Sequence, residues 1–63
     1  MTNLATDLSP AYLHRLLVDL DILNNELAVM AGVSVRTVYR WLSGTTPVPR
    51  SVVAMLELLK AKP

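Results

Sequence analysis

Apolar residues recur along the chain at the three- and four-residue spacing of α-helices, and no stretch alternates with the two-residue period of a strand. The first helical segment begins with Ser9 as its cap and Pro10 as its first residue, which is a typical helix start. Serine caps the first turn, and proline lacks an amide hydrogen that would have no helical partner there. We therefore expect a helix over residues 10–21, with an inward face of Leu13, Leu16, Leu17 and Leu20.

Two short helices joined by a tight turn are expected next. Asn24 is predicted to cap the first, which ends at Gly32, and Ser34 to cap the second, which ends at Gly44. Glycine permits the left-handed backbone of a tight turn, so the second helix starts immediately and crosses the first steeply. The expected inward residues of this pair are Leu27, Ala28, Ala31, Val38 and Trp41.

A last helix is predicted over residues 50–61, after a stiff loop that contains two prolines. Its apolar arc consists of Val52, Met55, Leu56 and Leu59. The chain is thus expected to be all-α: a mobile lead-in over residues 1–8, then one compact four-helix domain over residues 9–63, with a helix-turn-helix unit over about 24–44.

Composition restricts this picture to one small domain. The chain has 63 residues, of which 52% are hydrophobic and 17% charged, so apolar content is ample and disorder is not expected. The longest charge-free runs, residues 27–35 and 41–49, are far shorter than the roughly 20 residues of a membrane span. The first residues lack the basic and apolar regions of a secretion signal, and cysteine is absent, so we expect a cytoplasmic protein.

The most informative segment is the predicted helix-turn-helix. It resembles the phage-repressor and Cro-like (Xre-type) family of DNA-binding proteins, which have a lambda-repressor-like fold. The resemblance extends over roughly residues 10–60 and is carried by Glu26, Leu27, Ala28, Ala31, Gly32, Val33, Ser34, Arg36, Thr37, Val38, Trp41 and Gly44. It implies a regulator of transcription that binds double-stranded DNA, of the phage or prophage repressor type, and acts by occupying an operator.

In this fold the second helix of the unit lies in the major groove. An arginine side chain can bind O6 and N7 of a guanine together, and an apolar side chain can contact the thymine methyl group. Tyr39 has two readings: it stacks on the sugar-phosphate backbone or it shields the stem of Arg40. Outside the motif, these residues would simply form a solvated face. The expected base contacts are Val35, Arg36, Tyr39 and Arg40.

Phosphate contacts are expected from hydroxyl and amide side chains near the helix starts and from the loop after the unit. For Asn24 and Ser34 the alternative is that they only cap helices and bind no phosphate. The full set implied by the resemblance and by the fold is Asn24, Ser34, Thr37, Thr45, Thr46 and Arg50.

No enzyme chemistry is visible in the sequence. His14 has no cysteine, histidine or acidic residue at ligand spacing, so no metal site is expected. We also find no nucleophile–base pair and no glycine-rich phosphate loop, and the sequence indicates no cofactor and no small-molecule ligand.

Charge and apolar surplus both point to partners. Residues 1–30 carry a net charge of −3 and residues 31–63 a net charge of +4, so the second half is suited to face an anion. A single module reads few base pairs, and we expect a homodimer through Val53, Ala54 and Leu58, with Leu4 and Leu8 from the lead-in. The alternative is a protein-interaction module of the same fold (an anti-repressor, antitoxin or host-factor binder) that uses an exposed Val29 and Met30.

Overall fold

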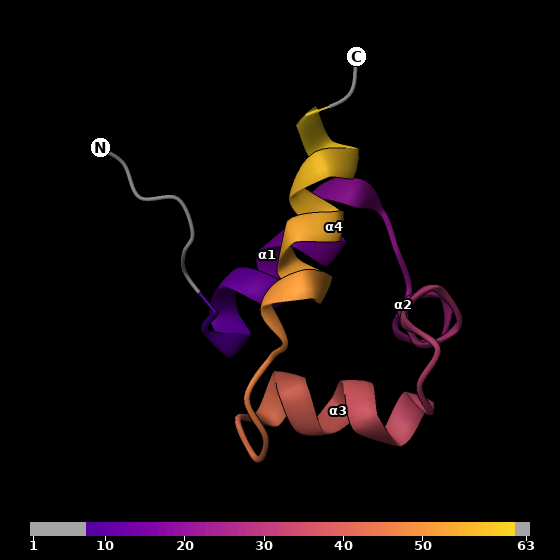
Figure 1. The fold of residues 1–63 in the computed structure, drawn as a ribbon, viewed down its shortest axis with the longest axis vertical. Helices are drawn as coiled ribbons and strands as arrows, with labels where there is room; N and C mark the ends of the chain where they lie inside the picture. The colour runs from indigo at the N-terminus through magenta and orange to yellow at the C-terminus, as the bar shows by residue number, and fades with distance from the viewer. Residues whose placement is uncertain (1–7, 62–63) are drawn as a thin grey trace.

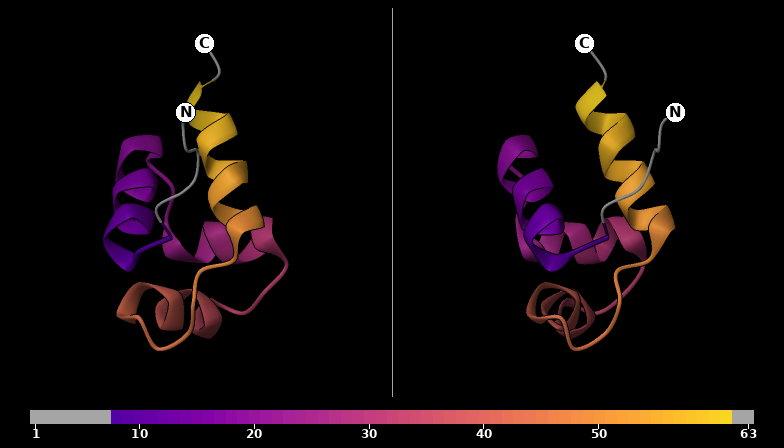
Figure 2. Two further views of the ribbon diagram at one scale, coloured as in Figure 1. Left: turned by 60° about the vertical axis from the view of Figure 1, so that its left-hand side comes forward. Right: turned by 90° about the vertical axis from the view of Figure 1, so that its left-hand side faces the viewer.

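The chain folds into four α-helices, seen in a computed structural model that describes residues 8–61 (Figure 1). They are α1 (Pro10–Leu20), α2 (Asn24–Ala31), α3 (Val35–Ser43) and α4 (Arg50–Ala61). Helices α1 and α4 lie side by side, and α3 packs against both α1 and α2 (Figure 2). No strand occurs within residues 8–61. The predicted all-α, four-helix architecture is confirmed, whereas residues 1–7 of the lead-in predicted over residues 1–8 lie outside the described residues.

The ends of the helices follow local signals in the sequence. The Ser9 hydroxyl accepts a hydrogen bond from the Tyr12 amide at 3.2 Å, as the predicted cap of α1 requires. Helix α1 ends one residue earlier than predicted, because Asp21 adopts a left-handed conformation with φ of 59°. Aspartate tolerates this region better than most residues, since its short polar side chain can bond locally.

The prediction that Asn24 caps α2 is wrong. Leu23 occupies the cap position and has an extended backbone, while Asn24 is already the first helical residue. The Glu26 carboxylate accepts a hydrogen bond from the Leu23 amide at 2.8 Å. The start of α2 is therefore stabilised by a glutamate reaching back to the cap residue, one half of a capping box, without a side-chain cap.

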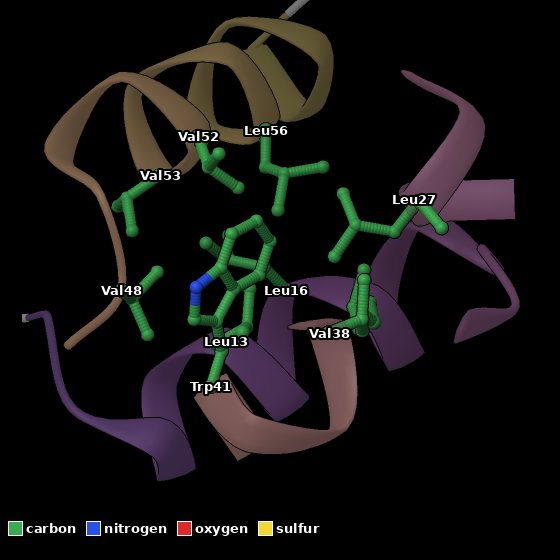
Figure 3. Packing of buried hydrophobic residues seen from close by; sticks show 11 residues of the cluster. Leu13, Leu16, Leu27, Val38, Trp41, Val48, Val52, Val53 and Leu56 are labelled. Carbon is green, nitrogen blue, oxygen red and sulfur yellow. The ribbon is translucent and has the colours of Figure 1, made fainter. Parts of the chain in front are cut away.

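The core is a single apolar cluster to which all four helices contribute (Figure 3). Trp41 lies in the middle of it and is 4% exposed, with Val52, Val53 and Leu56 of α4 nearby (Figure 3). The buried residues are Leu13, Leu16, Leu17, Leu27, Ala28, Val38, Trp41, Val48, Val52, Val53 and Leu56.

Three positions differ from the predicted core. Val48 and Val53 are each 2% exposed although neither was expected to be buried, and Leu59, which was predicted to face inward, is 39% exposed. Val48 is apolar within a loop, where periodicity gives no signal. Leu59 lies near the end of α4, whose last turn extends past the end of α1 (Figure 2), so little covers it there.

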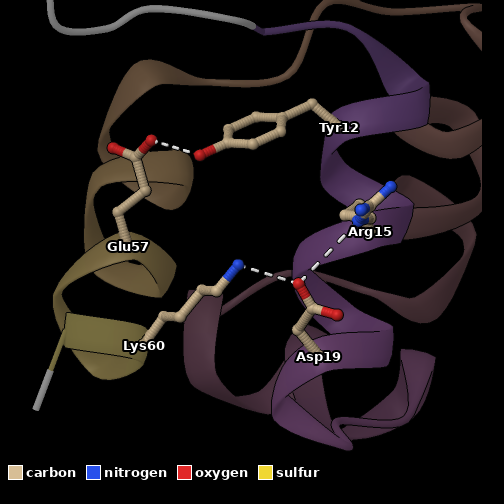
Figure 4. A network of polar contacts seen from close by, with 5 residues as sticks. All are labelled: Tyr12, Arg15, Asp19, Glu57 and Lys60. Atoms are coloured by element: carbon tan, nitrogen blue, oxygen red, sulfur yellow. Dashed lines mark hydrogen bonds and ion pairs between the residues drawn. The ribbon is translucent and has the colours of Figure 1, made fainter.

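A polar network joins α1 to α4 along their exposed edge (Figure 4). The Tyr12 hydroxyl donates to Glu57 Oε2 at 2.6 Å, and Lys60 Nζ donates to Asp19 Oδ2 at 2.8 Å. Arg15 Nε lies 3.9 Å from the same Asp19 oxygen. The hydrogen bond from Lys60, with smaller contributions from the charges of Lys60 and Arg15, holds the pKa of the Asp19 carboxyl below its ordinary value.

Candidate nucleic-acid interface

The turn between α2 and α3 sets the position of α3, the helix predicted to contact the bases. Gly32 adopts a left-handed conformation with φ of 73°, and the Val33 amide donates back to the Ala28 carbonyl at 2.9 Å. Ser34 then caps α3, accepting a hydrogen bond from the Thr37 amide at 3.2 Å. Two helices joined by three residues and packed at a steep angle form a helix-turn-helix, as predicted (Figure 1).

Helix α3 separates apolar and polar side chains onto opposite sides. Val38 and Trp41 enter the core, where they are 0% and 4% exposed. The four residues predicted to contact bases are all exposed, and they belong to the first two turns of the helix: Val35, Arg36, Tyr39 and Arg40. The structure thus brings the predicted base-contacting set together on the side of α3 away from the core.

The arginines at this site make no ion pair with any residue in the described part of the chain. Both ion pairs found within residues 8–61 involve Asp19 of α1, with Arg15 and with Lys60. Arg36, Arg40 and Arg50 make no ion pair within that part of the chain, and all three are exposed. Guanidinium groups that stay charged and have no acidic neighbour attract an external anion.

The hydroxyls at the start of α3 are already engaged with one another. Ser34 Oγ lies 3.1 Å from Thr37 Oγ1 and also caps the helix. Both oxygens keep acceptor or donor capacity, since a hydroxyl has one hydrogen and two lone pairs. Asn24 is the first residue of α2, the first helix of the helix-turn-helix, and its side chain is half-buried.

The loop after α3 gives a mixed result. Thr45 is exposed and its hydroxyl lies 2.8 Å from Ser43 Oγ, and Arg50 is exposed at the first residue of α4. The predicted phosphate contact by Thr46 is wrong for this structure. Its Oγ1 is buried and has no hydrogen-bond partner within residues 8–61, so it does not face solvent.

Val48, which anchors this loop, was not among the residues predicted to matter here. Val48, between Pro47 and Pro49, is buried in the core and thereby ties the segment after α3 to the domain (Figure 3). The one hint of this burial in the sequence is that Val48 is an isolated apolar residue between two prolines.

The predicted dimer surface changes at two positions. Val53 is wrong as an interface residue: it is 2% exposed because it faces the core beside Val52. Leu8 is half-buried against the same core, and Leu4 lies outside the described residues. Ala54 and Leu58 are exposed, as that prediction requires.

Comparison with known proteins adds no relative: no family model, no curated protein and no solved structure matches the chain. Within residues 8–61, no group of three or more His, Cys, Asp or Glu side chains is placed to hold a metal ion. None of the four helices has the length and apolar character needed to traverse a bilayer.

Proposed function

We propose that the protein is a sequence-specific regulator of transcription that binds double-stranded DNA through α3. The observation that carries this proposal is the exposed side of α3, where Arg36 and Arg40 lie one turn apart and form no ion pair with any residue between 8 and 61. A helix of this size fits the major groove, and two arginines at this spacing present two forks to base edges.

The surroundings of α3 support the same orientation. Hydroxyl and guanidinium groups for the phosphates are available around it: Ser34 in the turn before α3, Thr37 in the first turn of α3, Thr45 in the loop after it and Arg50 at the start of α4. Val35 and Tyr39 add apolar and aromatic surface beside the arginines. Binding at an operator would act by occupancy, and a DNA-binding role agrees with the expected cytoplasmic location.

Duplex binding measured by fluorescence anisotropy tests the proposal. We expect binding to mixed-sequence DNA at about 50 mM salt that weakens steeply towards about 200 mM, because binding releases counterions. With a preferred sequence selected from a random library, Arg36→Ala and Arg40→Ala should each lose about 1–3 kcal/mol of discrimination. Arg50→Ala should weaken all sequences alike and lower the salt slope by about 0.9.

Arg15→Ala is the matched control. It removes the same charge from a side chain that is 74% exposed, but on α1 rather than α3. If it lowers sequence preference as much as Arg36→Ala does, the effect is general electrostatics and α3 does not read bases. Absence of any duplex binding at about 50 mM salt contradicts the proposal and favours the protein-interaction module.

A further inference from the structure

The exposed apolar surface beside α2 is not used by the proposed DNA interface. A hollow of about 510 Å³ is lined by the first two residues of the α1–α2 linker and by one side of α2. Val29 is 82% exposed and Met30 41% exposed, the exposure predicted from the sequence. The lining residues are Asp21, Ile22, Asn25, Glu26, Val29 and Met30.

The charge of this hollow points away from nucleic acid. Asp21 and Glu26 contribute two carboxylates and no lining residue is cationic. No ion pair within residues 8–61 neutralises either acid, although Glu26 accepts a hydrogen bond from the Leu23 amide. An apolar hollow with an acidic rim repels phosphates and fits an apolar side chain accompanied by a cation.

The same chain carries a surface with this complementary chemistry. At the end of α4, Leu58 is 68% exposed and Leu59 39% exposed, and Ala61 is also exposed. Lys60 follows the two leucines, and its side chain remains 49% exposed although it pairs with Asp19. The last turn of α4 is therefore both apolar and cationic.

We propose that the hollow beside α2 binds the C-terminal end of α4 of a second copy of the chain. Leu58 would fill the hollow against Val29 and Met30, and Lys60 would lie near the acidic rim. The hollow and the end of α4 are made of different residues, so the contact joins unlike surfaces of the two copies. This association does not depend on DNA binding, and it replaces pairing of α4 with α4.

An unlike-surface contact has a distinctive consequence. A pair of molecules joined by one contact still has one free hollow and one free α4 end. Assembly then either closes when the second pair of surfaces meets, giving a two-fold dimer, or continues to larger species. The buried area is small, so we expect association in the micromolar to sub-millimolar range.

Sedimentation equilibrium of the full chain, without DNA, tests this with two complementary variants. Val29→Glu damages the hollow and leaves the α4 end intact, whereas Leu58→Glu does the reverse, and both residues are exposed enough to keep the fold. Each variant alone should lose self-association by about tenfold or more. An equimolar mixture should regain dimers and nothing larger, because it offers one intact contact per pair.

Two further measurements sharpen the result. Association of the natural chain should weaken as salt rises, and Asp21→Asn should weaken it while keeping a residue that tolerates the left-handed conformation. The matched control is Val18→Glu, which changes a valine that is 62% exposed but does not line this hollow. We expect it to associate as the natural chain does.

Other outcomes overturn the proposal. If Leu58→Glu is monomeric while Val29→Glu still associates, α4 pairs with α4. A natural chain that stays monomeric at sub-millimolar concentration rules out a second copy as the occupant of the hollow. Loss of association in Val18→Glu would place the contact on a neighbouring hollow that Val18 lines together with His14 and Leu23, and not on the hollow beside α2. Circular dichroism of each variant separates these results from unfolding.

Discussion

The α1–α4 half and the α2–α3 half of the molecule differ in whether their charged side chains are paired. Along α1 and α4, Asp19 is paired with Lys60 and Arg15, and Glu57 accepts the Tyr12 hydroxyl. On α3, Arg36 and Arg40 find no such partner within residues 8–61. The first arrangement uses charge to join helices, and the second leaves charge free for an external partner.

The largest expected effect comes from the residue on which both halves depend. Trp41 belongs to α3 but lies in the middle of the common core (Figure 3), so Trp41→Ala should cost about 3–5 kcal/mol. In a domain of this size such a loss leaves little or no folded population. Thermal unfolding followed by circular dichroism would detect it. Tyr39→Ala, on the exposed side of the same helix, should change stability by less than about 0.5 kcal/mol.

A smaller effect is expected from the turn of the α2–α3 half. Gly32 has a left-handed backbone and nothing lies within 4 Å of where a Cβ would be, so Gly32→Ala adds no clash. The cost is conformational alone, about 1–2 kcal/mol, because residues with a Cβ disfavour this region. Urea unfolding would measure it. Gly32→Asn should recover part of the loss, and an alanine variant as stable as the natural chain would argue against the left-handed turn.

The α1–α4 half should respond to its hydrogen bonds. Tyr12→Phe removes the hydroxyl that donates to Glu57 at 2.6 Å, and we expect a loss of about 1–2 kcal/mol. Glu57→Gln keeps an acceptor oxygen and should lose less. If both variants also impaired duplex binding of the folded protein, the two halves would not be independent. Urea unfolding and anisotropy on the same samples separate these effects.

Thr46 gives a small effect of the opposite sign. Its Oγ1 is buried without a partner among the described residues, so Thr46→Val replaces a costly hydroxyl by a methyl of similar shape. We expect stability to rise by up to about 1 kcal/mol and duplex binding to stay the same. Thr45→Val, which changes an exposed hydroxyl, is the companion variant. A loss of DNA affinity in Thr46→Val would restore the phosphate contact that the structure argues against.

The smallest expected effect is a dependence of stability on acid. The pKa of Asp19 is lowered in the folded protein, so the unfolded state takes up a proton first as the pH falls. The stability contributed by this group is therefore present above about pH 4 and declines as the pH drops through the folded-state pKa. Urea midpoints at a series of acidic pH values would show it. Asp19→Asn should flatten that part of the profile.

The parts of the fold that could be predicted from the sequence are those set by local signals, namely helix caps and left-handed glycines. Ser9, Ser34 and the glycines at 32 and 44 act within a few residues of themselves, so the helix ends were predicted to within one residue apart from the cap of α2. The exposed side of α3 was predictable for a similar reason, since Val38 and Trp41 fix its rotation.

Long-range packing accounts for what could not be predicted. Val52 and Val53 are adjacent and equally apolar, and only the position of α4 over the core shows that both are buried. Thr46 reads as a polar loop residue, yet the loop carries its hydroxyl inward because Val48 is anchored in the core. Hydrophobic periodicity within one segment contains no information about such neighbours.

The two-sided character of α3 has a consequence for how this molecule can change. Val38 and Trp41 support the domain from one side, while Arg36 and Arg40 on the other are exposed and make no ion pair within residues 8–61. Substitutions on the exposed side therefore change the chemistry of this surface at almost no structural cost. A library varied at residues 35, 36, 39 and 40 should consist mostly of folded proteins, and under the proposed function it should contain altered sequence preferences.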